Sequence, residues 1–426
     1  MRYSITTLGC KVNQYETQAI DAILQERGHN SVKSEADAVI VNTCAVTAES
    51  GRKSRQAVRR IRQDNPGALV VVCGCFSQVS PEEARDLDAD IIYGTGDKIK
   101  LVDDLEAAFS SRQPVENIDD PFKRMIFEQL PAGAVDGRTR AMLKIQDGCD
   151  NFCTYCIIPY ARGRVRSLPL KDAAKQAKEL AEQGFKEIVI TGIEIASYGK
   201  EFRDGTGMID VIEAVSKAVP DLRIRLGSLE PTIITRDFCS RLYSLGNVCA
   251  HFHLSLQSGS DATLTAMRRK YTTQEFFAVT ELLREFFPDC ALTADLIAGF
   301  PGETEGEHLE TLEFIEKCRF SSMHIFPYSI RPGTKAAEMK NQHNKALKAS
   351  RAHEAQAIAD KMQMDYLESC VSKKMQVLFE TFADGKCMGH AENYCAVSAE
   401  GEQLRGLVRS VEITHISCGM LVGKII

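Results

Sequence analysis

The sequence predicts an α/β protein built from three successive units. Strand-like apolar runs alternate with amphipathic helical stretches over residues 1–110, and the same alternation resumes after residue 138. Residues 371–426 differ, because they consist of short β-like runs broken by glycine. Strands that alternate with helices form parallel sheets covered by helices, and 426 residues exceed what one ordinary core holds.

The first unit, residues 1–112, is predicted to be a doubly wound parallel sheet. Its expected strands are Arg2–Thr7, Ala38–Asn42, Leu69–Cys73 and Asp90–Tyr93. Its expected helices run from about Tyr15 to a stop at Gly28, over Ala48–Arg62 and over Lys98–Phe109. Ser80, Pro81 and Glu83 suit the N-cap, first-turn and capping-box positions of a further helix.

The second unit, residues 135–366, follows a linker at residues 113–134, within the stretch Ser110–Arg138 that contains several prolines and glycines. Its six expected strands are Ala141–Gln146, Lys186–Thr191, Leu222–Gly227, Ala250–Leu256, Ala291–Ile297 and Ser322–Phe326. Helices separate most of these strands, for example Lys171–Gln183, Thr273–Phe286 and Glu303–Lys317. Six βα units predict a partial TIM-type barrel, whose chemistry lies at the C-terminal ends of its strands.

The third unit, residues 367–426, is predicted to be a small β-barrel. One long helix, His343–Ser369, leads into it, and the runs MQVLFE, YCAVSA, LRGLVRSVEIT and MLVGKII follow. Six Lys/Arg balance six Asp/Glu from Val371 to Ile426, so this unit carries no net charge. RNA recognition there would depend on shape and on stacking through Phe379, Phe382 and Tyr394.

Composition places the chain among ordinary globular proteins of a reducing compartment. Apolar residues make up 44% and charged residues 26%, and runs such as Ala68–Cys73 are too short to cross a bilayer. The N-terminus MRYSITTLGC lacks the apolar region of a signal peptide, which predicts a cytoplasmic protein without a membrane partner. Fifteen cysteines then indicate metal ligands, reactive thiols or small buried residues rather than disulfides.

Three closely spaced cysteines, Cys149, Cys153 and Cys156, directly follow the first strand of the second unit. Thiolates at this spacing converge on one soft metal centre, either zinc or iron–sulfur. A structural zinc site needs a fourth ligand, and the next cysteine along the chain is Cys239 and the next histidine is His251. Three thiolates on a four-iron cluster instead leave one iron open for an exchangeable ligand.

Three further cysteines, Cys10, Cys44 and Cys75, each lie just beyond the C-terminal end of a predicted strand in the first unit. Those ends form one edge of a doubly wound sheet, so the three loops can converge despite their separation in sequence. The pattern alone leaves two interpretations open, a metal site or buried structural cysteines.

The motif CxxxCxYC, with Tyr155 before the last cysteine, resembles the signature of radical S-adenosylmethionine (SAM) enzymes. The resemblance implies that Cys149, Cys153 and Cys156 hold a [4Fe–4S] cluster whose open iron binds SAM. It further implies that an electron from the cluster cleaves SAM to a 5′-deoxyadenosyl radical, and that Tyr155 packs near the adenine of SAM. Polar residues at the predicted strand ends are candidates for contacts with SAM or substrate, or else satisfied turn residues: Glu194, Ser228, Glu230, Gln257, Asp295 and Arg331.

The segments LGCKVNQYE, VNTCAVT and GCFSQ resemble the three N-terminal motifs of the methylthiotransferase family. This resemblance implies a second [4Fe–4S] cluster on Cys10, Cys44 and Cys75, whose open iron is implicated in sulfur delivery. Cys73 ends the run LVVVC and is expected to be a buried strand residue instead. LGSLEP, HLSLQSGSD and DLIAGFPGET extend the resemblance through the second unit, and the tail is similar to the RNA-binding TRAM module.

Within that family, LGCKVNQYE and CDNFCTYCIIPYARGRVRS are most similar to the bacterial branch that acts on threonylcarbamoyladenosine in tRNA. That branch adds a methylthio group at C2 of adenine 37, which implies the tRNA anticodon region as a partner and an electron donor such as flavodoxin or ferredoxin. Two other branches remain alternatives, one acting on isopentenyladenosine in tRNA and one on a ribosomal-protein aspartate. An alternative of a different class is a non-catalytic RNA-binding protein stabilised by zinc.

Basic stretches offer contacts to RNA although the chain has a net charge of -6. Residues 52–63, RKSRQAVRRIRQ, contain six basic side chains and no acid, and Arg162, Arg164 and Arg166 follow the central cysteines. Such side chains bind RNA phosphates or stack on bases. The alternatives are a solvated helix face for the first stretch and a salt-bridged barrel rim for the three arginines.

Overall fold

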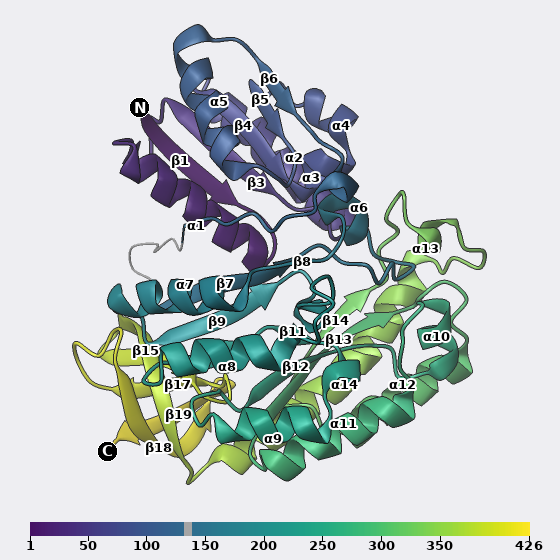
Figure 1. Ribbon diagram of the computed structural model, residues 1–426. Coiled ribbons are helices and arrows are strands. Elements are labelled where there is room, and N and C mark those ends of the chain that lie inside the picture. Colours follow the sequence, from purple (N-terminus) through teal and green to yellow (C-terminus); the bar gives the residue numbers. More distant parts are fainter. Residues whose placement is uncertain (132–138) are drawn as a thin grey trace.

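The computed structural model describes residues 1–131 and 139–426 and confirms the predicted α/β class. An N-terminal sheet stacks above a parallel βα barrel, and a small closed β-barrel lies beside the opposite end of that barrel (Figure 1). None of the helices in these residues combines the length and apolar character that a membrane crossing demands.

Six parallel strands form the N-terminal sheet in the order β2-β1-β3-β4-β5-β6. They are β1 (Arg2–Thr7), β2 (Asn30–Ser31), β3 (Ala38–Thr43), β4 (Leu69–Gly74), β5 (Ile91–Tyr93) and β6 (Val115–Asn117). β2 lies on one side of β1 and the other strands lie on the opposite side, so the sheet is doubly wound with its switch point between β1 and β3. One face is covered by α1 (Lys11–Glu26) and α5 (Lys98–Ser111), and the other by α2 (Ala48–Asp64), α3 (Cys75–Val79) and α4 (Pro81–Arg85).

Three details of this unit differ from the predictions. α1 begins at Lys11 rather than near Tyr15, because the extended residue Cys10 serves as its N-cap directly after β1. Ser80 precedes α4, but its side chain caps no backbone N–H, so the expected capping box does not form. The stretch predicted as a linker contains β6, which pairs with β5. A strand this short carries no periodicity that a sequence pattern could reveal.

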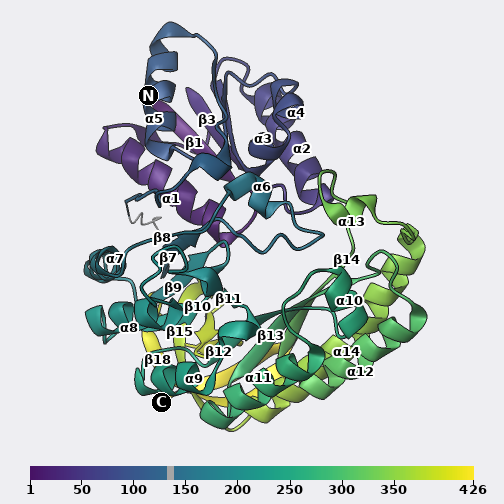
Figure 2. The same ribbon diagram turned by 45° about the vertical axis from the view of Figure 1, so that its right-hand side comes forward.

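The second unit is an open barrel of parallel strands with one short antiparallel strand, β8, at its edge (Figure 2). Its strands are β7 (Arg140–Asp147), β8 (Arg166–Ser167), β9 (Glu187–Gly192), β10 (Arg223–Leu226), β11 (Ser228–Leu229), β12 (His251–Gln257), β13 (Ala291–Ala298) and β14 (Ser322–Pro327). β10 pairs with β9, whereas β11, which lies just beyond the predicted strand Leu222–Gly227, pairs with β12, so the chain around Gly227 joins the two halves of the barrel. The partial-barrel prediction is confirmed.

Helices pack on the outside of this barrel and bury its apolar core. They are α7 (Leu170–Glu182), α8 (Met208–Ala218), α9 (Arg236–Ser244), α10 (Asp261–Ala266), α11 (Thr273–Phe286), α12 (Glu305–Cys318) and α14 (Lys345–Cys370). Two short helices differ, since α6 (Ile158–Arg162) packs against the N-terminal unit and α13 (Lys335–Glu338) packs in a small separate cluster. Side chains alternate along β12, where Leu254 and Leu256 are buried in the core and His253 and Gln257 are only partly buried. Strand alternation therefore turns the polar residues toward the barrel interior.

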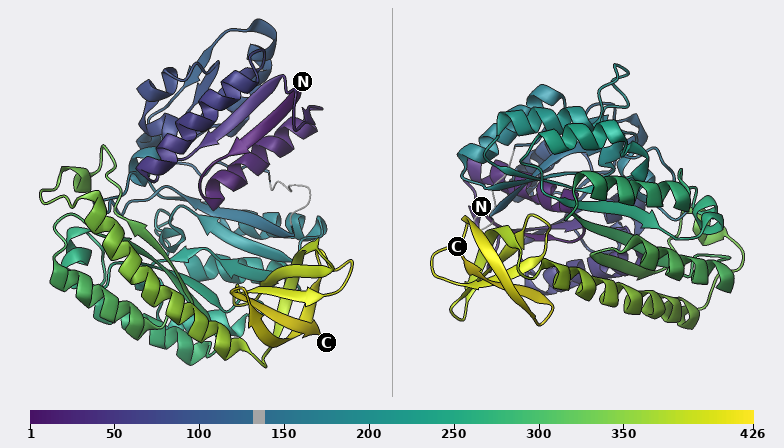
Figure 3. Two further views of the ribbon diagram at one scale, coloured as in Figure 1. Left: turned by 180° about the vertical axis from the view of Figure 1, so that it is seen from behind. Right: turned by 90° about the horizontal axis from the view of Figure 1, so that it is seen from below.

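Five strands close the C-terminal β-barrel in the order β15-β16-β17-β19-β18 (Figure 3). They are β15 (Lys374–Ala383), β16 (Lys386–Ala391), β17 (Ala396–Glu400), β18 (Val408–Ser417) and β19 (Met420–Ile425). Val377, Val397, Val411 and Leu421 are fully buried inside it. The predicted small β-barrel is confirmed, and closure leaves it without exposed strand edges.

Candidate functional site

Three loops bring the dispersed cysteines to one edge of the N-terminal sheet. Cys10 follows β1, Cys44 follows β3, and Cys75 is the first residue of α3 after β4. These strands are adjacent and parallel, so the three loops lie at the same end of the sheet, beside its switch point. That end faces the βα barrel, since the backbone N–H of Ala48 donates to Ser329 Oγ across the interface at 3.1 Å.

The loops after β1 and β3 touch each other. A Cβ atom on Gly9 would lie 2.9 Å from Cys44 Sγ, and Gly9 has a φ of +105°, so this position accepts only glycine. Burial raises the pKa of Cys44, and the charge of Cys75 raises it further. Burial also raises the pKa of Cys75, where the charge of Cys10 adds to the shift. The three thiols therefore share one electrostatic site, a donor set that fits an iron–sulfur cluster.

Cys73 takes no part in this site. It lies in β4 with its side chain fully buried in the core on the α1 face of the sheet. Burial raises the pKa of its thiol to about 12. Its surroundings are those of a small apolar residue, as the sequence predicted.

The second cysteine set lies in one loop at the C-terminal end of β7 and consists of Cys149, Cys153 and Cys156. The loop begins at Gly148, which has a φ of +76° and whose Cβ would lie 1.8 Å from the Arg164 carbonyl oxygen. Thr154 in the middle of the loop is bound through its backbone N–H to the Met267 carbonyl at 3.1 Å. Local backbone contacts thus hold the loop against the barrel.

Burial dominates the electrostatics of this loop. It raises the pKa of Cys156 to about 12 and that of Cys149 well above its usual range. Arg269 donates from Nη1 to Cys153 Sγ at 3.3 Å and also pairs with Glu230. Thiols beside a guanidinium are a donor set that fits an anionic iron–sulfur cluster. Because these thiols are protonated when free, metal binding there must release protons.

Glu194 and Glu230, two of the predicted contact residues, line one pocket together with Cys153 and Arg269. Burial raises the pKa of Glu194, and the charge of Glu230 adds to that shift. The Glu194 Oε1 atom is buried and has no hydrogen-bond partner among the residues that the structure describes. Tyr155, in the cysteine loop itself, packs against a small apolar cluster. These residues lie beside the barrel cysteines, and their assignment as SAM contacts stays a prediction.

Ser228 and Gln257, two further predicted contact residues, lie on the neighbouring strands β11 and β12. Ser228 is exposed on β11, and Gln257 ends β12 with a φ of +67°. No hydrogen bond of either side chain is formed within the two described ranges of the chain. Their side chains are available to a ligand, and their assignment as contacts stays a prediction.

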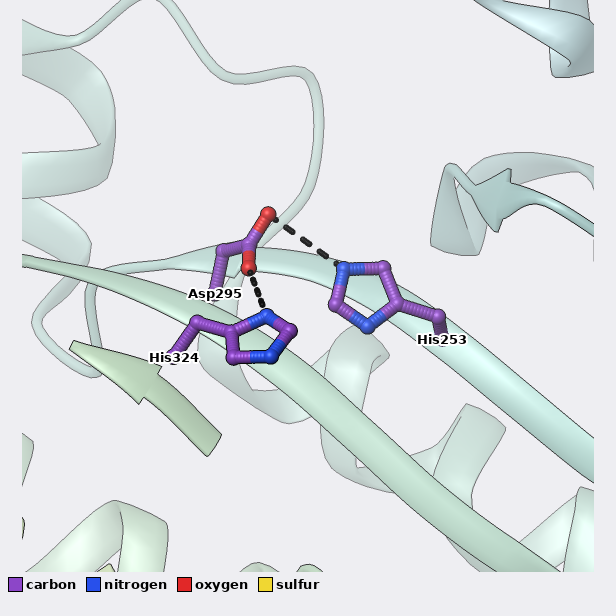
Figure 4. A group of neighbouring side chains, drawn as sticks. All are labelled: His253, Asp295 and His324. Atoms are coloured by element: carbon purple, nitrogen blue, oxygen red, sulfur yellow. Dashed lines mark hydrogen bonds and ion pairs between the residues drawn. The ribbon is translucent and has the colours of Figure 1, made fainter. Parts of the chain in front are cut away.

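Asp295 lies within β13 rather than beyond its end, between two histidines of the adjacent strands (Figure 4). His253 Nε2 is 3.3 Å from one carboxylate oxygen, and His324 Nδ1 is 3.2 Å from the other. Burial opposes ionisation of Asp295, but the two imidazoles hold its pKa well below its usual range. Thr293 Oγ1 fixes the other ring nitrogen of His253 at 2.9 Å. A divalent cation accepts such a donor set, although hydrogen bonds already satisfy these groups.

Arg331 lies beside the N-terminal cysteines and not in the pocket around Cys153. Its Nη1 atom is 3.5 Å from the place of a Cβ atom on Gly51 in α2. Burial lowers its pKa, whereas the charges of Cys44 and Cys75 raise it. The geometry therefore places this predicted contact residue at the other cysteine site.

Two of the three arginines after the central cysteines form salt bridges inside the protein. Arg162 is fully buried and pairs with Glu16 of α1, and Arg166 lies 3.3 Å from Asp147. Lys144 joins both acids, at 3.1 Å from Glu16 and 2.8 Å from Asp147. RNA binding is therefore the wrong interpretation for these two arginines, because the network uses them to join α1 to the barrel.

Other basic side chains of these two stretches are exposed. The Arg164 side chain is 62% exposed, and its Nη1 atom lies 3.8 Å from Asp150. Four of the six basic residues of the stretch in α2 form ion pairs: Arg52, Arg55, Arg60 and Arg62. Lys53 and Arg59 are exposed and form no ion pair within the described parts of the chain. The stretch is thus a partly paired, solvated helix face with two free cations.

The aromatic residues of the C-terminal barrel divide into buried and exposed ones. Phe379 is fully buried in the barrel core. Tyr394 is stacked on His251 at 4.9 Å and lies under the Arg225 guanidinium at 4.8 Å, which fixes it against the βα barrel. Base stacking is therefore a wrong expectation for Phe379, whereas Tyr394 is 37% exposed and its stacking on RNA stays a prediction. Phe382 is 51% exposed and remains free to stack.

The sequence did not single out Arg269, Lys144 or Glu16. Arg269 stands in the basic run MRRK, close after the motif HLSLQSGSD, and Glu16 is the last residue of LGCKVNQYE. The motifs HLSLQSGSD and LGCKVNQYE resemble those of the family, but neither shows which distant side chain Arg269 or Glu16 contacts.

A barrel of βα units with a three-cysteine loop after its first strand defines a radical SAM enzyme. The radical SAM superfamily model matches residues 143–315, and a model described as uncharacterized protein family UPF0004 matches residues 2–94. The radical SAM methyltransferase TsrM from Kitasatospora setae shares the fold, with a TM-score of 0.59 and 14% identity over 85% of this chain and 89% of that chain. Superfamily membership brings a [4Fe–4S] cluster and SAM as cofactors.

Relatives that match nearly the whole chain show which family of radical SAM enzymes it belongs to. "Threonylcarbamoyladenosine tRNA methylthiotransferase MtaB" of Bacillus subtilis (strain 168) is 38% identical over 96% of this chain and 92% of its own length. "tRNA-2-methylthio-N(6)-dimethylallyladenosine synthase" of Alkaliphilus oremlandii (strain OhILAs) is 32% identical over 100% and 93%. The chain belongs to the tRNA methylthiotransferase family of radical SAM enzymes, which confirms the predicted family.

Proposed function

We propose that this protein adds a methylthio group at C2 of N6-threonylcarbamoyladenosine at position 37 of tRNA. One observation carries the proposal: two three-cysteine sites meet at the same interface, since Ile157, the neighbour of Cys156, packs in the same apolar cluster as Cys75. Relatives named for threonylcarbamoyladenosine are 34–38% identical to the chain, and those named for dimethylallyladenosine are 32–33% identical. The difference favours the first substrate.

The chemistry explains why two sites are needed. The C2–H bond of adenine is too weakly acidic for a side-chain base, so acid–base catalysis cannot insert sulfur there. Bound SAM and its cluster supply radical chemistry instead. We assign that cluster to Cys149, Cys153 and Cys156, and a second [4Fe–4S] cluster to Cys10, Cys44 and Cys75. The Glu194, Glu230 and Arg269 side chains bind and orient SAM beside the first.

The proposal extends to the organisation of the chain and its partners. Residues 1–112, 135–366 and 367–426 act as methylthiotransferase, radical SAM and TRAM-like RNA-binding domains. The partner is the anticodon region of tRNA, and a donor such as flavodoxin or ferredoxin supplies electrons. Because tRNA is modified in the cytoplasm, we place the protein there.

The test compares nucleosides from tRNA of cells with and without this protein by mass spectrometry. We expect methylthio-threonylcarbamoyladenosine to disappear in the deletion strain and to return with the wild-type chain. Loss of methylthio-isopentenyladenosine, or of a methylthio-aspartate in a ribosomal protein, would instead assign one of the other branches. A colourless protein that holds zinc in place of about eight irons would contradict the enzyme assignment altogether.

A further inference from the structure

Arg331 is a buried cation that lacks a counter-ion. Its side chain lies in the loop after β14 and the residue is only 7% exposed. Its Nε atom is buried without a hydrogen-bond partner, and no carboxylate of residues 1–131 or 139–426 lies within 4.0 Å of the guanidinium. Other buried arginines differ, since Arg225 pairs with Glu187 at 2.7 Å and Arg351 with Glu303 at 2.7 Å.

The acid that most affects Arg331 is already engaged. Glu83 raises the pKa of Arg331, but this carboxylate lies 2.8 Å from Arg55. The guanidinium lies against α2, since its Nη1 atom is 3.5 Å from the place of a Cβ atom on Gly51. The same helix holds the Cys44 loop, because the backbone N–H of Cys44 donates to Ser54 Oγ at 3.2 Å. The unpaired guanidinium therefore lies beside the N-terminal cysteine site.

The buried salt-bridge network beside this site has surplus positive charge as well. It contains three cations, Lys144, Arg162 and Arg166, but only two carboxylates, Glu16 and Asp147. Ala161, the neighbour of Arg162, packs in the same apolar cluster as Cys75. Two independent groups thus leave positive charge beside the N-terminal cysteines.

A buried positive charge of this kind requires a compensating negative charge. Arginine does not lose its proton inside a protein, and an ionised group away from water is stable only when an opposite charge or a hydrogen bond compensates it. Three thiolates on a metal cluster supply that negative charge. Hydrogen bonds to cluster sulfurs and local charge set the reduction potential of iron–sulfur centres.

We propose that Arg331 is the counter-ion of the thiolate-bound centre at Cys10, Cys44 and Cys75. A residue of the βα barrel then completes the metal site of the N-terminal unit. The inference rests on the proposed function, which puts an iron–sulfur cluster on these cysteines. It follows that Arg331 stabilises the more negative, reduced cluster and that cluster binding strengthens the interface between α2 and the loop after β14.

The first test measures the reduction potential of this cluster by EPR-monitored titration. The full chain is used with Cys149, Cys153 and Cys156 replaced by alanine, so that only the N-terminal cluster is observed. We expect Arg331→Gln to lower the reduced-to-oxidised ratio at a fixed potential about tenfold, which is about 59 mV for one electron. Arg331→Lys should restore most of it, and the control Arg236→Gln in α9, which removes an arginine paired with Glu285 at 2.6 Å, should leave it unchanged.

The second test measures thermal unfolding of the same full-length variants with and without the cluster. Arg331→Gln should raise the melting temperature of the cluster-free chain, because it removes an uncompensated charge, and lower that of the loaded chain. A shift of the same sign in both forms, or an unchanged potential, would overturn the inference while leaving the proposed function intact. Failure of the unsubstituted Arg331 chain to assemble this cluster would instead refute the proposed function.

Discussion

The two cysteine sites are built in opposite ways. Cys149, Cys153 and Cys156 lie in one loop that backbone hydrogen bonds within the barrel unit hold, whereas the N-terminal set depends on three parallel strands packing side by side. The cation beside the barrel loop, Arg269, is paired with Glu230, whereas Arg331, beside the N-terminal set, has no carboxylate partner among the residues that the structure describes. The first site is therefore contained within the barrel unit, and the second depends on the sheet and on its contact with the barrel.

The largest effect should come from breaking the local site. Cys149→Ala removes a ligand from the site that we assign to SAM cleavage, so we expect complete loss of both 5′-deoxyadenosine and methylthiolated nucleoside. Mass spectrometry of a reconstituted reaction measures both products. Cys239→Ala, which changes a buried cysteine far from either set, should retain both. Residual SAM cleavage in Cys149→Ala would show that this thiol does not hold the cluster.

A second change tests how far the N-terminal site depends on the domain interface. Glu16→Gln leaves the three buried cations of the network, Lys144, Arg162 and Arg166, with the single carboxylate of Asp147. Breaking a buried ion pair on one side costs about 3–5 kcal/mol, so a large fall in melting temperature is expected. The exposed residue Glu26 on the same helix is the matched control, and Glu26→Gln should change stability by less than about 0.5 kcal/mol.

The pH dependence of stability sharpens the same point with a smaller effect. Burial opposes ionisation of Glu16, but Arg162 and Lys144 outweigh it and hold its pKa at about 2, below the ordinary 4.5. Because the folded-state pKa is depressed, the stabilisation is complete above pH 4.5 and disappears as the pH falls toward 2. Melting temperatures measured across this window should fall less steeply for Glu16→Gln than for the wild type. Parallel slopes would contradict the assignment.

The smallest effect is expected far from both cysteine sites. Phe382 is exposed on β15, and loss of one stacked base costs about 1–3 kcal/mol of binding free energy, so Phe382→Ala should weaken tRNA binding without changing stability. Phe379→Ala should do the reverse, because that ring fills the barrel core. Filter binding and thermal unfolding distinguish the two. Equal tRNA affinity in Phe382→Ala and wild type would exclude Phe382 as a stacking platform.

Sequence patterns predicted the architecture because it repeats. The alternation of apolar strands with amphipathic helices recurs along the first two units. The structure confirms the N-terminal sheet, the βα barrel and the small β-barrel. The cysteine loop after β7 was readable from spacing alone. The N-terminal cysteine site could be predicted only from the position of each cysteine after a strand. Cys10 and Cys75 are far apart in sequence, and the order of the parallel strands brings them together.

Side-chain partnerships across the interface were not predictable. No sequence pattern near Arg162 predicts its salt bridge with Glu16, and none near Arg331 predicts that it lies close to the Cys44 loop. Tyr394 is conspicuous in a short β-like run, yet its stacking on His251 depends on how two units dock. Pairs of this kind are set by tertiary packing, which local periodicity does not encode.

The most direct test of the division of labour between the two sites uses Cys75→Ala. The reconstituted variant is supplied with SAM, a reductant and unmodified tRNA, and 5′-deoxyadenosine and methylthio-threonylcarbamoyladenosine are quantified together. The account predicts that SAM cleavage continues while methylthiolated nucleoside is not formed. Equal loss of both products, with the barrel cluster still assembled, would contradict the assignment of separate roles to the two cysteine sets.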